Sequence, residues 1–326
     1  TAAAQESRGL GDVYKRQGIF LSYIGLGANL LHLSYCHQIA KKHGPVTIIT
    51  LCKNLKEALA DDPLIEDVYY LDKYHKKLLD IFNLSKVLKQ FHFQNLLIYY
   101  PSLRLYFAAK IAGIDNIWSY KSKNKKNLHL VKSAKELTEN FLNIDNCLTE
   151  TNFFIDKDRI KKIKEELNNN SYKIVIGAGS SGPTTRWGSN NYANLINKLN
   201  ELDDYFFFIL CGPNEKEIEN HILSKLKKKN FLTLSSKKIY DLIPYLGISD
   251  IYVGNDSFGS HVVSQCGKKS IVFLLDAPKA YTDYSENYYR IVPDGYKIDE
   301  ITHGTNADPN SILISDVVEI INKLKN

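Results

Sequence analysis

The chain has 326 residues, of which 44% are apolar and 24% charged, and its net charge is +6 at pH 7. This composition is that of a globular protein with a large core, and the length predicts two domains. No apolar run reaches the roughly 18 residues that a membrane-spanning helix needs, so any membrane association is expected to be peripheral. The positive charge fits either a solvated lysine-rich surface or a face for anionic lipid or acidic glycans.

The cysteines are odd in number, widely spaced and without a C-x-x-C pair, a pattern typical of reduced thiols in a cytosolic protein. They are Cys36, Cys52, Cys147, Cys211 and Cys266. Residues 1–17 are polar and patternless, and 12–17 look like the translated end of a transposase library adaptor. We therefore expect 1–17 to be a non-native leader and exclude it from the fold prediction.

From residue 18, strands and helices alternate, which predicts a parallel sheet. A strand at 19–24, a glycine turn at 25–29 and a helix at 30–42 resemble the opening unit of a Rossmann-like domain. The next expected strands are 46–51, 68–71 and 96–100, and the next helices are 55–60, 81–91 and 103–112. A basic loop at 121–127 and helices at 128–142 and 156–167 complete a first domain over 18–168.

The alternation restarts and predicts a second domain over 169–326. Its expected strands are 173–176, 205–210, 231–234 and 270–275, and its helices are 191–202, 215–227 and 239–246. Residues 250–266 add a strand, a polar turn and a helix. Two doubly wound Rossmann-like units facing across a cleft predict the α/β fold called GT-B. A final helix at 312–325 is expected to be able to pack back on the first domain.

The first loop of the second domain combines glycines with hydroxyl groups and a cation. Its polar residues are Ser180, Ser181, Thr184, Thr185 and Arg186. Glycines let a backbone approach a phosphate closely, and an arginine grips phosphate through two parallel hydrogen bonds. A flexible turn without a ligand is the alternative. The loop is not a Walker A motif, because no Gly-Lys-Ser/Thr sequence follows.

Two further strand ends of this domain carry polar residues. Glu215 follows the strand at 205–210 and could accept hydrogen bonds from ribose hydroxyls, or could simply favour a helix N-terminus. The turn of Asn255, Asp256 and Ser257 precedes a helix that contains Gly259 and His261. A helix N-terminus offers free N–H groups to a phosphate. Carboxyl ends of parallel strands meet at one edge of a sheet, so all three loops are expected to surround one crevice.

These motifs, in this order, resemble glycosyltransferase family 9, the ADP-heptose:lipopolysaccharide heptosyltransferases. The resemblance covers most of residues 19–290 and is stronger in the second domain. It implies that this domain binds a nucleotide sugar. The diphosphate would contact Ser180, Ser181, Thr184, Thr185 and Arg186; the ribose would contact Glu215; the phosphates and sugar would contact the 255–261 turn, including Asn255, Asp256, Ser257, Gly259 and His261.

Three residues depart from the family pattern. Thr185 stands where the family commonly has a lysine, and Phe258 stands where it has a glycine. Ala28 follows the glycine loop of the first domain where the family has an aspartate, its proposed general base. His32, four residues further on, would lie on the same helical face as Ala28 and is the candidate base. A histidine packed against the sheet, or a base elsewhere, are the alternatives.

On the acceptor side, the glycine loop contributes Gly25, Gly27 and Asn29, and Arg104 follows the strand at 96–100. Arg104 could bind an acidic sugar or a lipid phosphate, or could be a surface arginine.

The resemblance implies an inverting, metal-independent heptosyltransferase without a cofactor. Its donor would be a nucleotide-diphospho-sugar such as ADP-heptose, and its acceptor a lipopolysaccharide core or a related envelope glycan, reached at the cytoplasmic face of the inner membrane without nucleic acid. Two rival functions stay open. One is a nucleotide-sugar-binding protein that has lost catalysis, and the other is a sugar-nucleotide epimerase.

Overall fold

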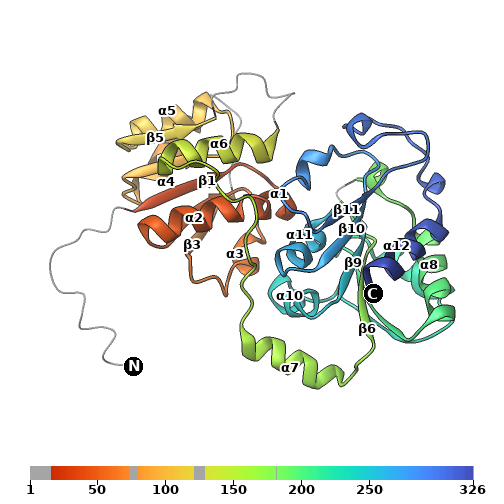
Figure 1. Ribbon diagram of the computed structural model, residues 1–326. Coiled ribbons are helices and arrows are strands. Elements are labelled where there is room, and N and C mark those ends of the chain that lie inside the picture. The colour runs from red at the N-terminus through yellow and green to blue at the C-terminus, as the bar shows by residue number, and fades with distance from the viewer. Residues whose placement is uncertain (1–15, 73–79, 121–128, 181, 326) are drawn as a thin grey trace.

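The computed structural model describes residues 16–72, 80–120, 129–180 and 182–325. Within them, the strands form two separate parallel sheets, each covered by helices on both faces (Figure 1). This arrangement confirms the predicted α/β fold with two doubly wound units. Ser181 and the basic loop at 121–127 lie outside the described residues.

The first sheet has the order β3-β2-β1-β4-β5. Its strands are β1 (Gln17–Leu21), β2 (Val46–Thr50), β3 (Ile65–Tyr70), β4 (Asn95–Ile98) and β5 (Asn116–Ser119). The helices of this half are α1 (Leu26–Leu30), α2 (Leu33–His43), α3 (Leu55–Ala58), α4 (Asp80–Lys89), α5 (Leu103–Ile111) and α6 (Leu130–Leu142). Every residue of β1 and β2 is buried, because helices cover both faces of the sheet.

The second sheet has the order β11-β10-β9-β6-β7-β8. Its strands are β6 (Tyr172–Gly177), β7 (Tyr205–Leu210), β8 (Phe231–Thr233), β9 (Ile251–Asn255), β10 (Lys269–Phe273) and β11 (Tyr288–Ile291). Its helices are α8 (Ser189–Leu202), α9 (Lys216–Lys225), α10 (Ile239–Gly247), α11 (Phe258–Gln265) and α12 (Ile314–Lys325), with short 3₁₀ turns η2 (Pro183–Thr185), η3 (Lys279–Tyr281), η4 (Ile298–Glu300) and η5 (Pro309–Ser311).

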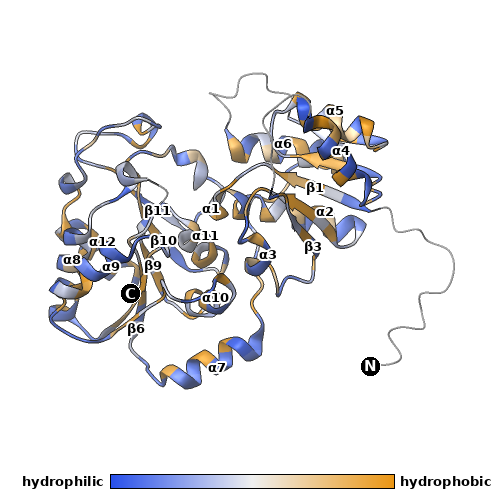
Figure 2. Ribbon diagram, turned by 180° about the vertical axis from the view of Figure 1, so that it is seen from behind, coloured by the Kyte–Doolittle hydropathy of each residue, from blue (hydrophilic) through white to orange (hydrophobic). Residues whose placement is uncertain are grey.

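The apolar side chains form three clusters. One lies between the first sheet and the pair α4 and α5, and another lies between the second sheet and the group α8, α9 and α12. The third is shared by both halves, because it joins residues of α2 and α6 to residues of α10 and α11. The hydropathy colouring shows the same distribution, with apolar strands inside and a largely hydrophilic α7 outside (Figure 2). The shared cluster packs the two halves against each other.

Helix α7 (Lys157–Leu167) connects the halves along one side (Figure 1). Asp156 caps it by accepting hydrogen bonds from the backbone N–H groups of Asp158 and Arg159, at 2.9 and 3.0 Å. The Arg159 guanidinium also pairs with Asp61 of the first half, while Ile160 packs beside Gly247 of α10. The helix therefore contacts both halves, and the proposed domain boundary at 168/169 stays a prediction.

Four sequence predictions need correction. The helix expected at 30–42 begins at Leu33 as α2, and the short helix α1 occupies most of the glycine turn expected at 25–29. Strands β5 and β11 were not predicted. Gln17 is a buried residue of β1, so the first strand begins inside the stretch 1–17 that was excluded from the fold prediction. The last helix, α12, packs against α8 through buried Val317 and Ile321 and not on the first half.

Candidate functional site

A cavity of about 860 Å³ lies between the two halves, at the carboxyl ends of β1, β6, β7 and β9. Both halves line it, as the sequence predicts for strand-end loops. Ten of the predicted site residues are among its lining: Gly25, Gly27, Ser180, Thr184, Thr185, Arg186, Glu215, Asp256, Ser257 and His261. Five described ones are not: Asn29, His32, Arg104, Asn255 and Gly259. The structure therefore brings most of the predicted donor-binding residues together and places the catalytic candidate elsewhere.

Glu215 and Arg186 form an ion pair in this cavity. Nη2 of Arg186 donates to Oε1 of Glu215 at 2.8 Å. The same carboxylate accepts from the backbone N–H groups of Ser180, at 3.0 Å, and Gly212, at 2.6 Å. A side chain at Gly179 would collide with Glu215, since its Cβ would lie 2.0 Å from Oε2. Glu215 thus ties together the loops that follow β6 and β7.

Arg186 keeps binding capacity beyond this pair. Its Nη2 also donates to the carbonyl of Ser180 at 3.3 Å, but its buried Nε has no hydrogen-bond partner. A buried donor without a partner carries a free-energy penalty that an anionic ligand would remove. The guanidinium is therefore placed to bind an anion in the cavity.

The hydroxyl groups of the same loop are largely engaged with the loop itself. Ser180 Oγ lies 2.7 Å from Thr185 Oγ1, within hydrogen-bond distance. Each of these two hydroxyls donates either to the carbonyl of Gly182 or to the other hydroxyl. Thr184 Oγ1 donates to Asp276 Oδ2 at 2.5 Å. These bonds fix the shape of the loop, so the groups it offers a ligand are backbone N–H groups and Arg186.

The N-terminus of α11 opens onto the cavity. Ser257 is its N-cap residue, yet the Ser257 side chain makes no capping hydrogen bond and lies 2.9 Å from the hydroxyl of Tyr252. The first N–H groups of the helix thus have no side-chain acceptor. Such a terminus binds anions through its N–H groups and its partial positive charge.

Asp256 is a buried carboxylate beside that terminus. Its Oδ1 has no hydrogen-bond partner and lies 3.7 Å from Nε2 of His261. Burial raises the pKa of Asp256 to about 7, and the charge of Arg290 opposes this rise. Burial lowers the pKa of His261 to about 3, so its ring is neutral, with Nδ1 2.9 Å from the hydroxyl of Tyr284.

The two halves meet at this point. A Cβ on Gly27 would lie 2.9 Å from the ring of His261 and 3.6 Å from the backbone nitrogen of Phe258. The glycine therefore lets α1 approach the start of α11 closely. Leu26 and Ala28, next to Gly27, line the same cavity as Asp256.

Asn255 and Gly259 support the site without lining it. Fully buried Asn255 accepts at 2.9 Å from the backbone N–H of Trp187 and from the hydroxyl of Tyr192, and it donates to the carbonyl of Ala178 at 2.8 Å. Gly259 lies against Leu210, which a Cβ there would approach to 2.5 Å. Their predicted contact with a donor has no support in this geometry, because their neighbours are protein groups.

Asn29 and His32 are also buried in the protein. Asn29 donates to the carbonyls of Tyr23 and Gly25, at 3.0 and 2.7 Å, and accepts from Thr50 at 2.8 Å. This side chain closes the glycine turn after β1.

His32 is fully buried, and its ring stacks on Tyr23 with 4.9 Å between centroids. Its Nδ1 donates to the carbonyl of Ala28 at 2.7 Å, which leaves Nε2 to accept from the hydroxyl of Tyr120 at 3.3 Å. Burial lowers the pKa of His32 to about 4. The prediction of His32 as the base is therefore corrected: the packed histidine, its alternative, is what the structure shows.

Arg104 lies in the first turn of α5 and is not among the residues that line the cavity. Its predicted acceptor contact stays a prediction.

The sequence analysis did not single out several lining residues. Tyr281 comes from η3, and His303 and Asp276 come from loops near β10 and β11. Asp276 accepts from Thr184 and from the backbone N–H of Gly304. The available signal was position: Asp276 follows β10, whose carboxyl end meets the same sheet edge.

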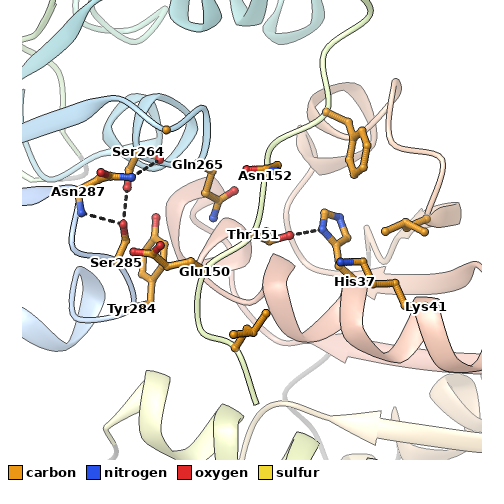
Figure 3. Close-up of a pocket in the computed structure, with 14 residues that line it drawn as sticks. His37, Lys41, Glu150, Thr151, Asn152, Ser264, Gln265, Tyr284, Ser285 and Asn287 are labelled. Atoms are coloured by element: carbon orange, nitrogen blue, oxygen red, sulfur yellow. Dashed lines mark hydrogen bonds between the residues drawn. The ribbon is translucent and has the colours of Figure 1, made fainter. Parts of the chain in front are cut away.

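A second cavity, of about 320 Å³, lies where residues 148–154 pass between α2 and the loop after α11 (Figure 3). The ring of His37 bonds Thr151 and Asp62, both at 2.6 Å. Asn287 bonds Ser264 and Ser285, at 3.1 and 3.0 Å. These groups satisfy one another, so we interpret this cavity as part of the junction between the halves.

Among the described residues, no group of three His, Cys, Asp or Glu side chains is arranged to hold a metal ion. No helix in that part of the chain is both long and apolar enough to span a membrane.

Comparison with known proteins identifies the family. The sequence profile of glycosyltransferase family 9 (heptosyltransferase) matches residues 107–296, more than half of the chain. No curated protein sequence matches.

Three solved structures share the fold. A family 9 glycosyltransferase from Veillonella parvula aligns with a TM-score of 0.77 at 17% identity, over 97% of this chain and 99% of that one. E. coli ADP-heptose LPS heptosyltransferase II aligns with a TM-score of 0.74 at 14% identity, over 95% and 98%. E. coli heptosyltransferase WaaC with ADP aligns with a TM-score of 0.68 at 12% identity, over 94% and 99%. The predicted GT-B architecture is confirmed, and the chain belongs to glycosyltransferase family 9, the heptosyltransferase family, and is a glycosyltransferase.

Proposed function

We propose that this protein transfers a sugar from a nucleotide-diphospho-sugar, with ADP-heptose as the first candidate, to a lipopolysaccharide core or a related envelope glycan. The transfer is a single displacement with inversion that needs neither a metal ion nor a cofactor. Family membership supports the reaction class. The names of two similar structures, an ADP-heptose LPS heptosyltransferase and a heptosyltransferase with ADP, support the choice of donor and acceptor.

One observation carries the donor site. The unpartnered Nε of Arg186 and the uncapped N-terminus of α11 line the same cavity. A departing diphosphate develops negative charge, which such preorganised donors stabilise in the transition state. Glu215 fixes Arg186 in place and retains a carboxylate edge for a ribose hydroxyl.

The acceptor enters from the first half in this proposal. Gly25, Leu26, Gly27 and Ala28 line that side of the cavity with backbone and small side chains. Alignment of an acceptor hydroxyl against the anomeric carbon makes the displacement effectively unimolecular. In this proposal the protein acts at the cytoplasmic face of the inner membrane, where it would reach the acceptor glycolipid by peripheral contact with the membrane.

The test is a turnover assay with purified protein, ADP-heptose and a heptose-deficient lipid A core acceptor, run with and without EDTA. We expect ADP release that depends on acceptor, an inverted anomeric linkage and full activity in EDTA. ADP binding without transfer would favour the binding-protein rival. Donor conversion without acceptor would favour the epimerase. Activity lost in EDTA and restored by a divalent cation would contradict metal independence.

A further inference from the structure

An inverting displacement needs a group that takes the proton of the acceptor hydroxyl. The sequence comparison implies a base at position 28, but this chain has Ala28 there, and His32 does not reach the cavity. The base must be sought among the titratable residues that the structure places in the cavity wall. These are Glu215, Asp256, Asp276, His261, His303, Tyr281 and Cys211.

Two of the three carboxylates are already engaged as acceptors. Glu215 accepts from Arg186 and from two backbone N–H groups. Asp276 accepts from Thr184 and the N–H of Gly304, and the Thr184 hydrogen bond holds the pKa of Asp276 below its usual value. Hydrogen bonds and positive charge that stabilise the ionised form make a carboxylate a weaker base. The lowered pKa makes Asp276 a weaker base, and the three hydrogen bonds of Glu215 hold it in a structural role.

The other titratable groups of the wall are unsuitable for different reasons. His261 has a pKa lowered to about 3 by burial, which makes its ring a weak base. His303 is exposed, and its Nδ1 donates to the carbonyl of Asp276 at 3.2 Å, which places it at the outer rim. Burial raises the pKa of Cys211 to about 12 and that of Tyr281 above its usual value, so both remain protonated.

Asp256 differs from all of these. Its side chain is 12% exposed, and its Oδ1 is buried without any hydrogen-bond partner, because even Nε2 of His261 is 3.7 Å away. The carboxylate lies at the seam between the halves, beside the point where Gly27 meets His261. The carboxylate, through its exposed fraction, lines the same cavity as Gly27 and Ala28, along which an acceptor would enter.

We propose that Asp256 is the catalytic base, which takes over the function that the missing carboxylate at Ala28 would have; the inference rests on the transferase function proposed above. The acceptor oxygen forms a bond to the anomeric carbon, and the bond from that carbon to the diphosphate breaks with its electron pair on the leaving oxygen. The acceptor proton passes to the carboxylate of Asp256 and then to solvent.

The surroundings of Asp256 suit this role. Burial raises its pKa to about 7, and general bases work best when their pKa is near the working pH. The charged group that opposes this rise is Arg290 of β11. The other titratable groups that face Asp256 come from α11, β9, β11, η3 and the loop between them: His261, Tyr252, Tyr288, Tyr281 and Tyr284. The phenols there have raised pKa values and stay neutral, and Arg290 itself pairs with the Asp283 carboxylate at 3.3 Å.

The experiment compares Asp256→Asn with wild type in ADP-heptose turnover, ADP binding by calorimetry, and pH profiles of kcat. Wild-type kcat should rise with pH through about 7, because the base must be ionised. Asp256→Asn should lower kcat by about 100-fold or more. The Kd for ADP should change less than about threefold, because the amide keeps the shape of the carboxylate and Asp256 acts on the acceptor proton.

A rescue pair separates catalysis from donor binding. Ala28→Asp in the Asp256→Asn protein returns a carboxylate to the cavity wall, and Ala28→Asn is its matched control without a base. We expect Ala28→Asp alone of the two to restore turnover at least tenfold, on the order of a general-base contribution. The rise of kcat should then shift to lower pH, because Ala28 is partly exposed and a carboxylate there would be better solvated.

Three outcomes would overturn the proposal. Asp256→Asn could keep kcat within threefold of wild type, which would place the base elsewhere. It could raise KM with kcat unchanged, which would make Asp256 a binding residue. Wild type could bind ADP yet never cleave ADP-heptose to ADP. This result would mean that no transfer occurs and that no residue acts as a base. Absence of ADP binding by wild type is a separate result, since it would refute the nucleotide site and with it the proposed function.

Discussion

Polar side chains that follow strands behave differently on the two sides of the cavity. In the second half, Arg186 after β6, Glu215 after β7 and Asp256 after β9 all reach the cavity wall. In the first half, Asn29 and His32 after β1 turn into the protein and bond its backbone. The first half therefore contributes shape, through Gly25 to Ala28, and the second half contributes the chemical groups.

The comparison shows that a polar residue in a strand-end loop has two possible uses. Asn255 in the second half does what Asn29 does in the first: each is buried and hydrogen-bonds three protein groups. Arg186 and Asp256, in contrast, each retain a buried polar atom without a partner. Satisfied polar side chains maintain the loop, and an unsatisfied one in the cavity wall is a candidate for contact with a ligand.

The largest expected effect concerns the two buried asparagines. Asn255→Ala and Asn29→Ala should each lower the free energy of unfolding by about 2–4 kcal/mol, because each leaves buried backbone groups unpaired. Urea denaturation followed by circular dichroism measures this loss. Arg186→Ala, in the same assay, should change stability by less than about 1 kcal/mol. An Asn255→Ala protein with full stability and abolished ADP binding would contradict the assignment of Asn255 as a structural residue.

Arg186 gives the next largest effect, and it acts on binding. Arg186→Ala should weaken ADP binding by about 10- to 100-fold, because it removes charge-assisted hydrogen bonds to the diphosphate. Arg186→Lys is the matched variant, because it keeps the positive charge and loses the planar guanidinium. Its Kd for ADP should lie between those of wild type and Arg186→Ala. Calorimetric titration with ADP measures all three proteins. An unchanged Kd in Arg186→Ala would remove Arg186 from the donor site and weaken the contrast between the two halves.

The sequence predicts the fold well where strands are long apolar runs. The strand expected at 205–210 is β7, with the same limits, because its six residues are apolar or aromatic and a parallel sheet buries both of their faces. Strands β5 and β11 were missed because they have four residues each and mix polar with apolar side chains. Edge strands pair with only one neighbouring strand, so their sequences lack the continuous apolar run of a central strand.

The sequence predicts the location of the site better than it predicts which side chains contact a ligand. Topology alone puts Arg186, Glu215 and Asp256 at one sheet edge, since they follow parallel strands. The direction of a side chain within a loop depends on the hydrogen bonds of that loop, which is why Asn255 and Asn29 were assigned to ligands. Tyr281 and His303 come from loops that have no periodicity, and no residue pattern indicated them.

The smallest expected effect tests the first half, through His32. His32→Gln keeps a side-chain donor for the carbonyl of Ala28 and removes the titrating ring, so transfer should stay within about twofold of wild type. The folded-state pKa of His32 is about 4, below its ordinary 6.5, so the unfolded chain binds more protons between these values. Wild type should therefore lose stability as pH falls from 6.5 toward 4.

In His32→Gln that loss should be smaller by roughly 1–3 kcal/mol. Unfolding in urea at pH 7.5 and at pH 4.5 measures the difference. Some acid sensitivity should persist, because His261, with its pKa lowered to about 3, contributes in the same direction. A His32→Gln protein that is as stable as wild type but transfers no sugar would return His32 to the chemistry. It would also mean that the first half supplies a reacting group, against the division between the halves that the structure shows.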